Sequence, residues 1–229
     1  VHGDGDGIAE ARLELGGRLS SRLRERSRRI GVNTASLFHL AWGLVLSRLT
    51  GQEKVVFGTV LFGRMQGAVG SDRGIGLFVN TLPVKIEVGR AGASESVRFV
   101  HRVLGELMRH EHTPLSLAQR CSGVSAPVPL FTSLLNCRQS GMEALDSSAV
   151  VWEGVELLSS KVRTNYPVVL SVDDFGDGFS LAVQVIDSVD PMRICAMMST
   201  ALESLAEALE SSPERPVGGL EVLPESERK

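Results

Sequence analysis

The chain contains few of the residues that usually reveal a metal, redox or nucleic-acid function. It has three cysteines in 229 residues, at positions 121, 137 and 195, and none of them stands in a CxxC pair. This spacing predicts neither a zinc knuckle nor a disulfide framework, and it favours a reducing cytoplasm. The formal net charge of −3 gives no reason to expect nucleic acid as the main partner.

A secretion signal and a membrane span are also missing from the pattern. Residues 1–7 are polar and do not resemble a signal peptide. They lack an initiator methionine, so we expect the chain to be cut from a longer one. Residues 34–50 form the most apolar segment, but it is too short and too often interrupted by polar residues to cross a membrane.

The remaining composition is that of an ordinary globular domain. Hydrophobic residues make up 43% of the chain, charged residues 22% and aromatic residues 5%. A length of 229 residues suits one large domain or two small lobes.

Apolar residues at helical spacing predict four long helices. Residues 17–30 form the first, and residues 34–50 form a buried second helix that Asn33 or Thr34 caps and Gly51 ends. Ser94 is expected to cap a third helix that ends near His110. Asp190-Pro191 begins the last helix, with proline at its favoured first position.

Several β-rich runs predict a sheet. The run at 55–62 resembles a central strand covered on both faces and interrupted by Gly58, and the next strand carries Asn80 and continues to Val88. Further strands are predicted at 130–137, 150–158, 168–172 and 179–185, the last two joined by a hairpin loop. Without strict βαβ alternation, the pattern predicts an α/β fold, a mixed sheet of about five or six strands packed by helices.

The most informative segment is Ile75–Pro83, in which an apolar run passes into Asn80 and Thr81 before a proline. A buried amide without a partner costs about 1–3 kcal/mol. Something near this strand must therefore bind Asn80 and Thr81. A structural hydrogen bond and a direct contact with a substrate both remain open.

Other polar clusters have ordinary explanations. His39 is expected to be a satisfied core residue, and His110 and His112 diverge at a helix end without a third metal ligand. The acidic loop at 173–178 lacks EF-hand spacing, and the glycine-rich loop at 66–74 lacks a following GK[ST]. The basic face of residues 18–29 is either a solvated helix face or a docking patch for an acidic partner.

Five segments together resemble, in order, the C-terminal lobe of a condensation domain from nonribosomal peptide synthetases. The most specific is the glycine–phenylalanine–valine–asparagine–threonine motif within Ile75–Pro83. The five segments are Val56-Phe57-Gly58-Thr59-Val60 through Gly63-Arg64, Ile75–Pro83, His110–Leu115, Pro129-Leu130-Phe131, and the tail with Leu223-Pro224-Glu225. The resemblance runs from about residue 10 to the end of the chain.

The resemblance implies a chloramphenicol acetyltransferase-like sandwich lobe over residues 1–210 and a linker toward an adenylation domain over 211–229. It implies acyl transfer, in which a carrier-bound amine attacks a carrier-bound acyl or peptidyl thioester. The expected partners are an N-terminal lobe with the HHxxxDG motif, carrier proteins and an adenylation domain, with no nucleic acid and no membrane. No cofactor is expected to bind directly, because phosphopantetheine arrives as the arm of the carrier.

The resemblance also assigns residues. Arg64, Gly76, Asn80 and Thr81 are expected at the substrate tunnel and at the lobe seam, the surface where the two lobes meet. Arg22, Arg26 and Arg29 are candidates for carrier docking. No catalytic residue is assigned, since no adjacent histidine pair occurs in the chain, and the isolated chain is expected to be inactive.

Two features depart from the family or leave alternatives open. Residues 125–128 stand where the seventh motif usually carries an arginine, so that arginine's role is in doubt. A docking module without chemistry, a starter domain that uses a fatty acyl thioester and an epimerisation domain remain alternatives. An acetyltransferase of the chloramphenicol type is disfavoured, because neither His39 nor His110 is followed four residues later by Asp.

Overall fold

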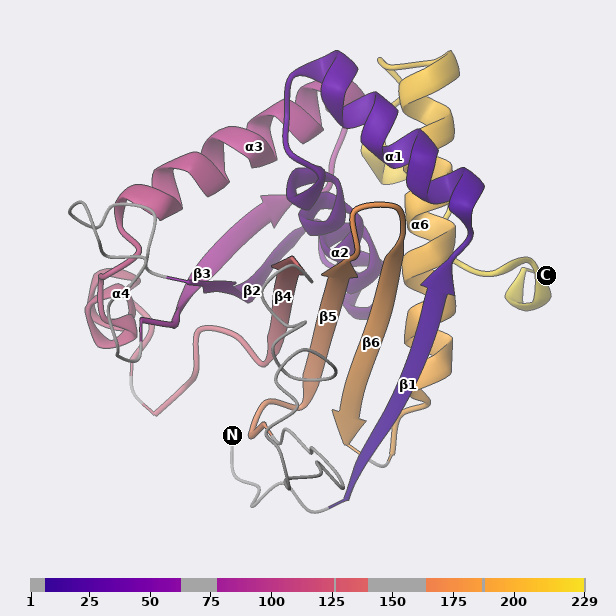
Figure 1. Cartoon of the computed structure of the whole chain (residues 1–229). Coiled ribbons are helices and arrows are strands. Elements are labelled where there is room, and N and C mark those ends of the chain that lie inside the picture. Colours follow the sequence, from indigo (N-terminus) through magenta and orange to yellow (C-terminus); the bar gives the residue numbers. More distant parts are fainter. Residues whose placement is uncertain (1–6, 63–77, 126, 140–163, 187, 229) are drawn as a thin grey trace, which may run out of the picture.

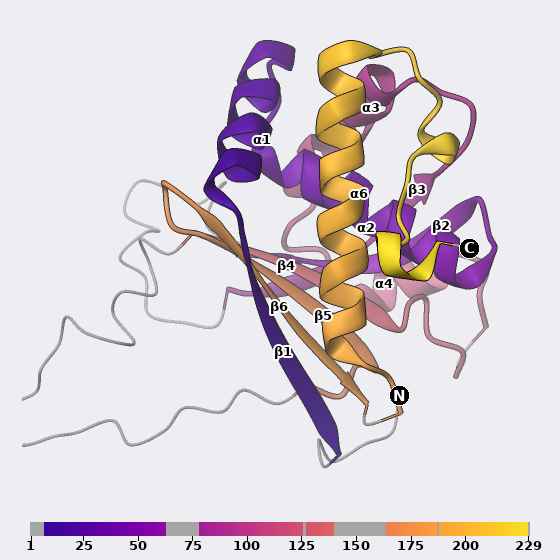
Figure 2. The same ribbon diagram turned by 90° about the vertical axis from the view of Figure 1, so that its right-hand side faces the viewer.

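A computed structural model describes residues 7–62, 78–125, 127–139, 164–186 and 188–228. The described residues form a six-stranded sheet in the order β1-β6-β5-β4-β2-β3, with helices packed against it (Figures 1 and 2). The strands are β1 (Ile8–Leu15), β2 (Lys54–Leu61), β3 (Asn80–Glu87), β4 (Ser133–Gln139), β5 (Val168–Asp174) and β6 (Phe179–Ile186). The helices are α1 (Gly17–Ile30), α2 (Thr34–Thr50), α3 (Ala93–Arg109), α4 (Leu115–Cys121), α6 (Pro191–Ser211), and the 3₁₀ turns η2 (Val217–Gly219) and η3 (Glu225–Glu227).

The sheet is mixed, which confirms the predicted α/β fold class. Strand β4 runs parallel to both β2 and β5, whereas β1 with β6, β5 with β6, and β2 with β3 are antiparallel. The β5–β6 hairpin is the one that alternation predicted, and its turn at Gly176 has a φ of +89° that suits glycine.

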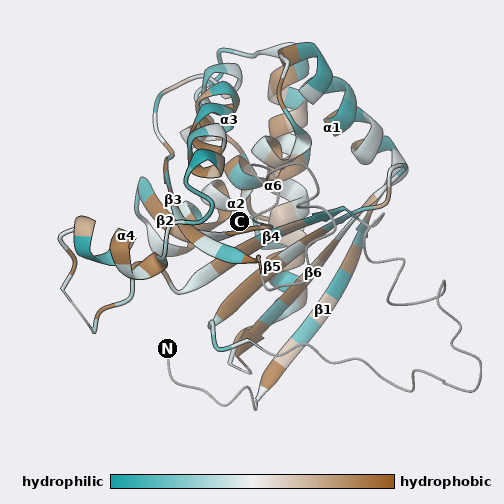
Figure 3. Ribbon diagram, turned by 60° about the vertical axis from the view of Figure 1, so that its left-hand side comes forward, coloured by the Kyte–Doolittle hydropathy of each residue, from teal (hydrophilic) through white to brown (hydrophobic). Residues whose placement is uncertain are grey.

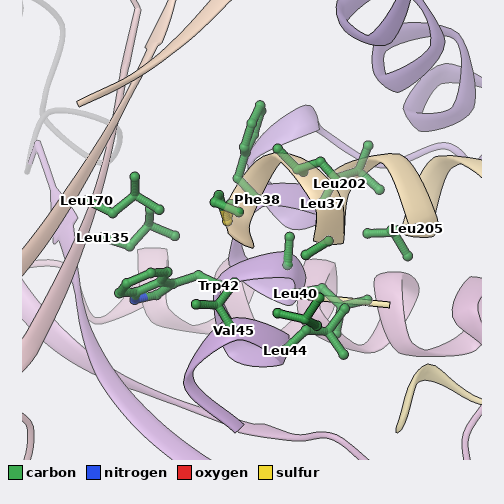
Figure 4. Packing of buried hydrophobic residues seen from close by; sticks show 14 of the residues in the cluster. Leu37, Phe38, Leu40, Trp42, Leu44, Val45, Leu135, Leu170, Leu202 and Leu205 are labelled. Atoms are coloured by element: carbon green, nitrogen blue, oxygen red, sulfur yellow. The ribbon is translucent and has the colours of Figure 1, made fainter. Parts of the chain in front are cut away.

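Helix α2 forms the centre of the core between the sheet and α6 (Figure 4). Phe38 and Trp42 are almost completely buried, as are Leu202 and Leu205 of α6. Its ends follow the prediction, because the Asn33 side chain accepts a hydrogen bond from the Ser36 amide and Gly51 ends the helix with a φ of 68°. The apolar segment that the sequence marks as buried is therefore the main packing element.

Several predicted boundaries were wrong. Phe78 and Val79 lie outside any strand, so Asn80 begins β3 instead of following an apolar strand. Gly92 is the N-cap of α3, and Ser94 lies within its first turn. Likewise β4 begins at Ser133, not at Leu130. The strand predicted at 150–158 lies outside the described residues.

Strand β2 also differs from the expectation of cover on both faces. Val56 is 39% exposed, so the face of the sheet opposite the helices is open at this point. Gly58 does not interrupt the strand, which continues to Leu61. A Cβ at Gly58 would overlap the side chains of Leu134 and Phe131, so the glycine admits a close approach instead.

Two terminal segments join the domain. Strand β1, which the sequence analysis did not predict, pairs with β6 along its whole length. In the C-terminal tail, Val217, Leu220 and Val222 are buried in the core, and the Gly218 amide donates a 3.0 Å hydrogen bond to the Gly89 carbonyl. The segment assigned as a linker is thus packed against the domain through its middle, and Glu227 near its end pairs with Arg193 of α6. Its role toward an adenylation domain stays a prediction.

Candidate functional site

Asn80 lies at the first position of β3 and holds the turn between α3 and α4. Its Nδ2 donates hydrogen bonds to the carbonyl oxygens of Glu111 at 2.8 Å and Thr113 at 2.7 Å. Its Oδ1 accepts a 2.9 Å hydrogen bond from the Thr81 amide. An asparagine amide has two donor hydrogens, and both are used here. Asn80 therefore organises backbone, and only the second lone pair of Oδ1 is left for another donor.

Strand pairing brings the end of β2 to the same place. Leu61 pairs with Asn80, and Val60 pairs with the half-buried Thr81. The end of the β2 run, the asparagine–threonine pair and the turn before Pro114 are distant in sequence but meet at this corner of the sheet. Figure 1 shows β2, β3 and α4 together at one side of the molecule.

An aromatic pair covers the open face of β2 nearby. Phe131 is 5% exposed and lies over Gly58, where a glycine leaves room for its ring. The ring stacks on Tyr166 with centroids 5.7 Å apart and planes 15° apart. Burial raises the pKa of the Tyr166 hydroxyl above its usual value. The segment that resembles the seventh motif thus packs against β2.

The turn held by Asn80 contains a buried carboxylate. The Glu111 side chain is 2% exposed, whereas that of His112 is 61% exposed, and His112 Nε2 lies 3.6 Å from Glu111 Oε1. When protonated, His112 can pair with this carboxylate from the solvent side. His110 ends α3 as its C-cap and is exposed, and the divergence of the two histidines stays a prediction.

His39 is a core residue, as predicted. It is 3% exposed, with Nδ1 at 2.7 Å from the Ala35 carbonyl and Nε2 at 2.8 Å from Thr59 Oγ1. A carbonyl can only accept, so Nδ1 carries the proton and Nε2 accepts from the threonine. Burial lowers the pKa of His39 to about 4. The imidazole is therefore neutral at pH 7 and inaccessible to a substrate.

Of the remaining predicted site residues, two lie outside the described ranges and three form ion pairs within the chain. Arg64 and Gly76 lie outside the described residues. Arg22 forms a two-point ion pair with Glu210, with nitrogen–oxygen distances of 2.9 and 2.8 Å. Arg26 lies 3.6 Å from the same carboxylate and 3.2 Å from Glu25.

Arg29 completes this group, because its guanidinium lies 2.8 Å from Glu25. All three arginines proposed for carrier docking thus have carboxylate partners within the chain. Their basic charge is partly neutralised, which weakens the patch as a free docking surface.

The described ranges contain no group of three or more His, Cys, Asp or Glu side chains that could hold a metal ion. Within the same ranges, no single helix has the length and apolar composition to span a membrane, and α1 and α2 meet that test only together, as a pair bent by 110°.

Two features of this site were missed in the sequence. The buried Glu111 has no local signal, since exposed and buried glutamates look alike in one sequence. Gly58 did carry a signal, because a glycine within a run of bulky strand residues often marks a close approach. The residue that approaches, Phe131, belongs to a segment the resemblance had already marked.

Comparisons with known proteins agree on one family. The model of the condensation domain matches residues 8–229. Malpibaldin synthetase and malpinin synthetase from Mortierella alpina are each 47% identical to the chain, over 227 and 229 residues. These matches cover 99% and 100% of the chain but only 4% and 3% of the two synthetases.

A solved structure supports the fold. The condensation domain from Monacolin K polyketide synthase MokA is similar with a TM-score of 0.69 and 24% identity. The match covers 92% of this chain and 48% of that one.

Proposed function

The chain belongs to the condensation domain family of nonribosomal peptide synthetases, and on this premise we propose that it is the C-terminal lobe of such a domain. The lobe has the chloramphenicol acetyltransferase-like arrangement. Together with an N-terminal lobe, it encloses the tunnel in which an amide bond forms between a carrier-bound acyl or peptidyl donor and a carrier-bound aminoacyl acceptor.

One observation carries this proposal. The chain is matched over 92% of its own length but over only 48% of the solved condensation domain, which supports one lobe of such a domain. The order of the five motif segments in the sequence indicates the C-terminal lobe. The convergence of three motif segments on the corner around Asn80 supports it, because this corner then lies at the lobe seam. Arg64 and Gly76 belong to the same proposed seam.

The residues of this lobe position groups and do not transfer the proton. Asn80 holds the carbonyls of Glu111 and Thr113 and so keeps the α3–α4 turn rigid. His39 is buried and has a pKa of about 4, so it is no base for the attacking amine. The histidine that accepts the proton belongs to the HHxxxDG motif of the N-terminal lobe. Orienting two bound reactants contributes about 7–11 kcal/mol.

The substrates reach the tunnel on phosphopantetheine arms of carrier proteins. An adenylation domain follows the tail at 211–229, and the cytoplasm is the proposed location, since all three cysteines are free. The donor is a peptidyl or aminoacyl group, and a fatty acyl donor would identify a starter domain instead.

The direct test is amide formation followed by mass spectrometry. Donor and acceptor carriers are loaded and mixed with the 229-residue chain, with and without a polypeptide that carries the HHxxxDG lobe. We expect product only when both lobes are present. Product from this chain alone would contradict the proposal, and so would a lack of product from both lobes with every donor class.

The role of Asn80 has a matched control in Asn33. Asn80→Ala leaves two carbonyls without a donor, and Asn33→Ala removes the cap of α2, each costing about 1–2 kcal/mol. Assayed in the two-lobe enzyme, Asn80→Ala should lower the rate of condensation and Asn33→Ala should not. Equal rates in the two variants would show that Asn80 serves stability alone.

A further inference from the structure

Helix α3 presents a basic face whose charges have no carboxylate partner in the described part of the chain. Arg98 and Arg102 are exposed and one turn apart, and Arg90 is exposed just before the helix. In the described ranges none of these three arginines has a carboxylate within ion-pair distance. The outward side of α3 is hydrophilic over much of its length (Figure 3).

An apolar side chain stands in the middle of this face. Phe99 is 46% exposed, and the guanidinium of Arg102 lies 5.9 Å from the centre of its ring. The ring therefore offers apolar surface to a partner between two arginines that have no ion-pair partner in the described ranges. The same combination of an aromatic ring and arginine is common at the centre of protein interfaces.

A hollow adjoins the ring. It measures about 250 Å³ and lies between α3, the end of β3 and the connection that joins them. Leu40, Ile86 and Val100 form its apolar floor, and Arg90, Glu95 and Arg102 stand at its rim. This volume accommodates an apolar side chain, and the rim supplies charge around it. We call these residues, with Arg98 and Phe99, the α3 groove.

We propose that the α3 groove is a docking site for an acidic amphipathic helix of a protein partner that inserts one apolar side chain beside Phe99. Carboxylates one turn apart on such a helix meet Arg98 and Arg102, which have the same spacing. The apolar side chain fills the hollow and covers the ring. The proposal does not depend on the proposed function of the chain.

The neighbouring features disfavour other occupants. Strand β3 is the edge strand of the described sheet, but Pro83 removes a donor from it and Lys85 is exposed on it, which opposes the addition of an extended strand. Glu87 and Glu95 line the same hollow, so it does not form the continuous basic surface that a nucleic acid backbone requires. An overall charge of −3 also opposes a polyanion that spreads beyond the groove.

The test is fluorescence anisotropy with the 229-residue chain and a labelled synthetic helix. The peptide has about 18 residues, glutamates at successive turns and one leucine. Two companion peptides carry glutamine for glutamate, or serine for leucine. A labelled single-stranded DNA serves as the nucleic-acid probe.

Variants of the chain distinguish binding at the α3 groove from nonspecific attraction of the peptide to positive charge. Arg98→Glu with Arg102→Glu, and Phe99→Ala, should each weaken binding by about tenfold. The matched control Arg109→Glu changes a 69% exposed arginine on the same helix that pairs with Glu106, and it should bind like the wild type. Phe175→Ala is the control for the aromatic ring, because Phe175 is 56% exposed in the distant β5–β6 hairpin.

Each outcome decides the proposal. The proposal is supported if only the groove variants lose affinity for the acidic peptide while their thermal midpoints stay near that of the wild type. Both companion peptides should also bind more weakly than the acidic peptide. Equal affinity of groove and control variants would overturn it, as would the absence of binding to the acidic peptide. Tight binding of the DNA that the peptide does not displace would assign the groove to nucleic acid.

Discussion

Helices α1 and α3 are both rich in arginine, but the fold treats the two sets differently. On α1, Arg22 and Arg24 reach carboxylates at Glu210 and Asp174, far away in the sequence. On α3, Arg98 and Arg102 reach none in the described part of the chain. The comparison teaches that a basic helix face becomes a docking candidate only when the fold leaves its charges without partners.

The difference follows from what lies beside each helix. Helix α1 runs next to α6 and above the β5–β6 hairpin, both of which carry acidic residues (Figure 1). Helix α3 packs its apolar side on α2 and β3 and turns its charged side outward. The arginines of α1 therefore stabilise the lobe, while those of α3 remain available.

The largest effect is expected at Arg24. Its guanidinium binds both oxygens of Asp174 and lies 4.1 Å from the centre of the Phe179 ring. Arg24→Ala should lower the free energy of unfolding by about 2–3 kcal/mol, because it leaves a half-buried carboxylate without its partner. Urea unfolding at pH 7 measures this, and Arg12→Ala, on an exposed pair, should cost under about 0.5 kcal/mol. Equal losses of unfolding free energy in Arg24→Ala and Arg12→Ala would contradict the expected difference between a half-buried and an exposed ion pair.

The Arg24 effect should also depend on pH. Burial acts to raise the pKa of Asp174, but hydrogen bonds from Arg24 and the Gly176 amide outweigh it, so the pKa lies below its usual value. A carboxyl group whose pKa is lower in the folded chain than in the unfolded chain stabilises the fold at pH values above its unfolded pKa. This stabilisation is lost as the pH falls through the folded pKa. The difference in the free energy of unfolding between wild type and Arg24→Ala should therefore become smaller below about pH 4. A difference that does not change with pH would mean that packing of Arg24 on Phe179 explains the whole loss of stability.

A smaller effect is expected where α1 meets α6. Glu210→Ala removes the partner of both Arg22 and Arg26 and should cost about 1 kcal/mol. A double-mutant cycle with Arg22→Ala should give a coupling of about 0.5–1 kcal/mol that falls at high salt. Zero coupling at low salt would mean that these ion pairs do not tie the helices together, and the contrast with α3 would lose its basis.

Helix α3 can be given an additional carboxylate close to Arg102. Gly105 is exposed within the helix, and nothing lies within 4 Å of a Cβ at this position. Gly105→Ala and Gly105→Glu should each stabilise the lobe by about 0.5–1 kcal/mol, because glycine is a poor helix residue. Glu106 already lies one turn from Arg102 but pairs with Arg109. Only Gly105→Glu adds a second carboxylate at about that distance, so only this variant should weaken binding of the acidic peptide. Weaker binding in both variants would argue against charge as the cause.

The smallest effect on stability is expected from the α3 arginines themselves. Arg98→Ala and Arg102→Ala should each change the free energy of unfolding by less than about 0.5 kcal/mol, since neither has a charged partner to lose. Urea unfolding beside Arg24→Ala gives the comparison. A loss above about 1 kcal/mol would show that α3, like α1, uses its arginines to stabilise the fold.

The sequence predicted the helices better than it predicted the strand ends. Strong periodicity and end residues such as Asn33, Gly51 and Asp190 predicted α2 and α6 almost to the residue. Strand β1 was not predicted, although its apolar residues alternate with polar ones at Ala9, Ala11, Leu13 and Leu15. Strand ends are harder to predict because their hydrogen bonds depend on neighbours from elsewhere in the chain.

The candidate site shows the same limit. The anomaly of Asn80 beside apolar residues was visible in the sequence, and so was the need for a partner. Its partners, the carbonyls of Glu111 and Thr113, lie 31 and 33 residues away, and no local pattern points to them. Local energetics shows that a polar group needs a partner, but only the chain path brings that partner within reach.

By itself, the sequence determined that the chain forms a mixed α/β domain around a buried helix, because burial of apolar residues follows their spacing along the chain. It also determined that His39 is a core residue and that Asn80 must be bound. The tertiary structure alone decided which arginines pair, because those on α1 look in sequence like those on α3. Long-range ion pairs depend on which elements pack side by side, and that packing is a property of the whole fold.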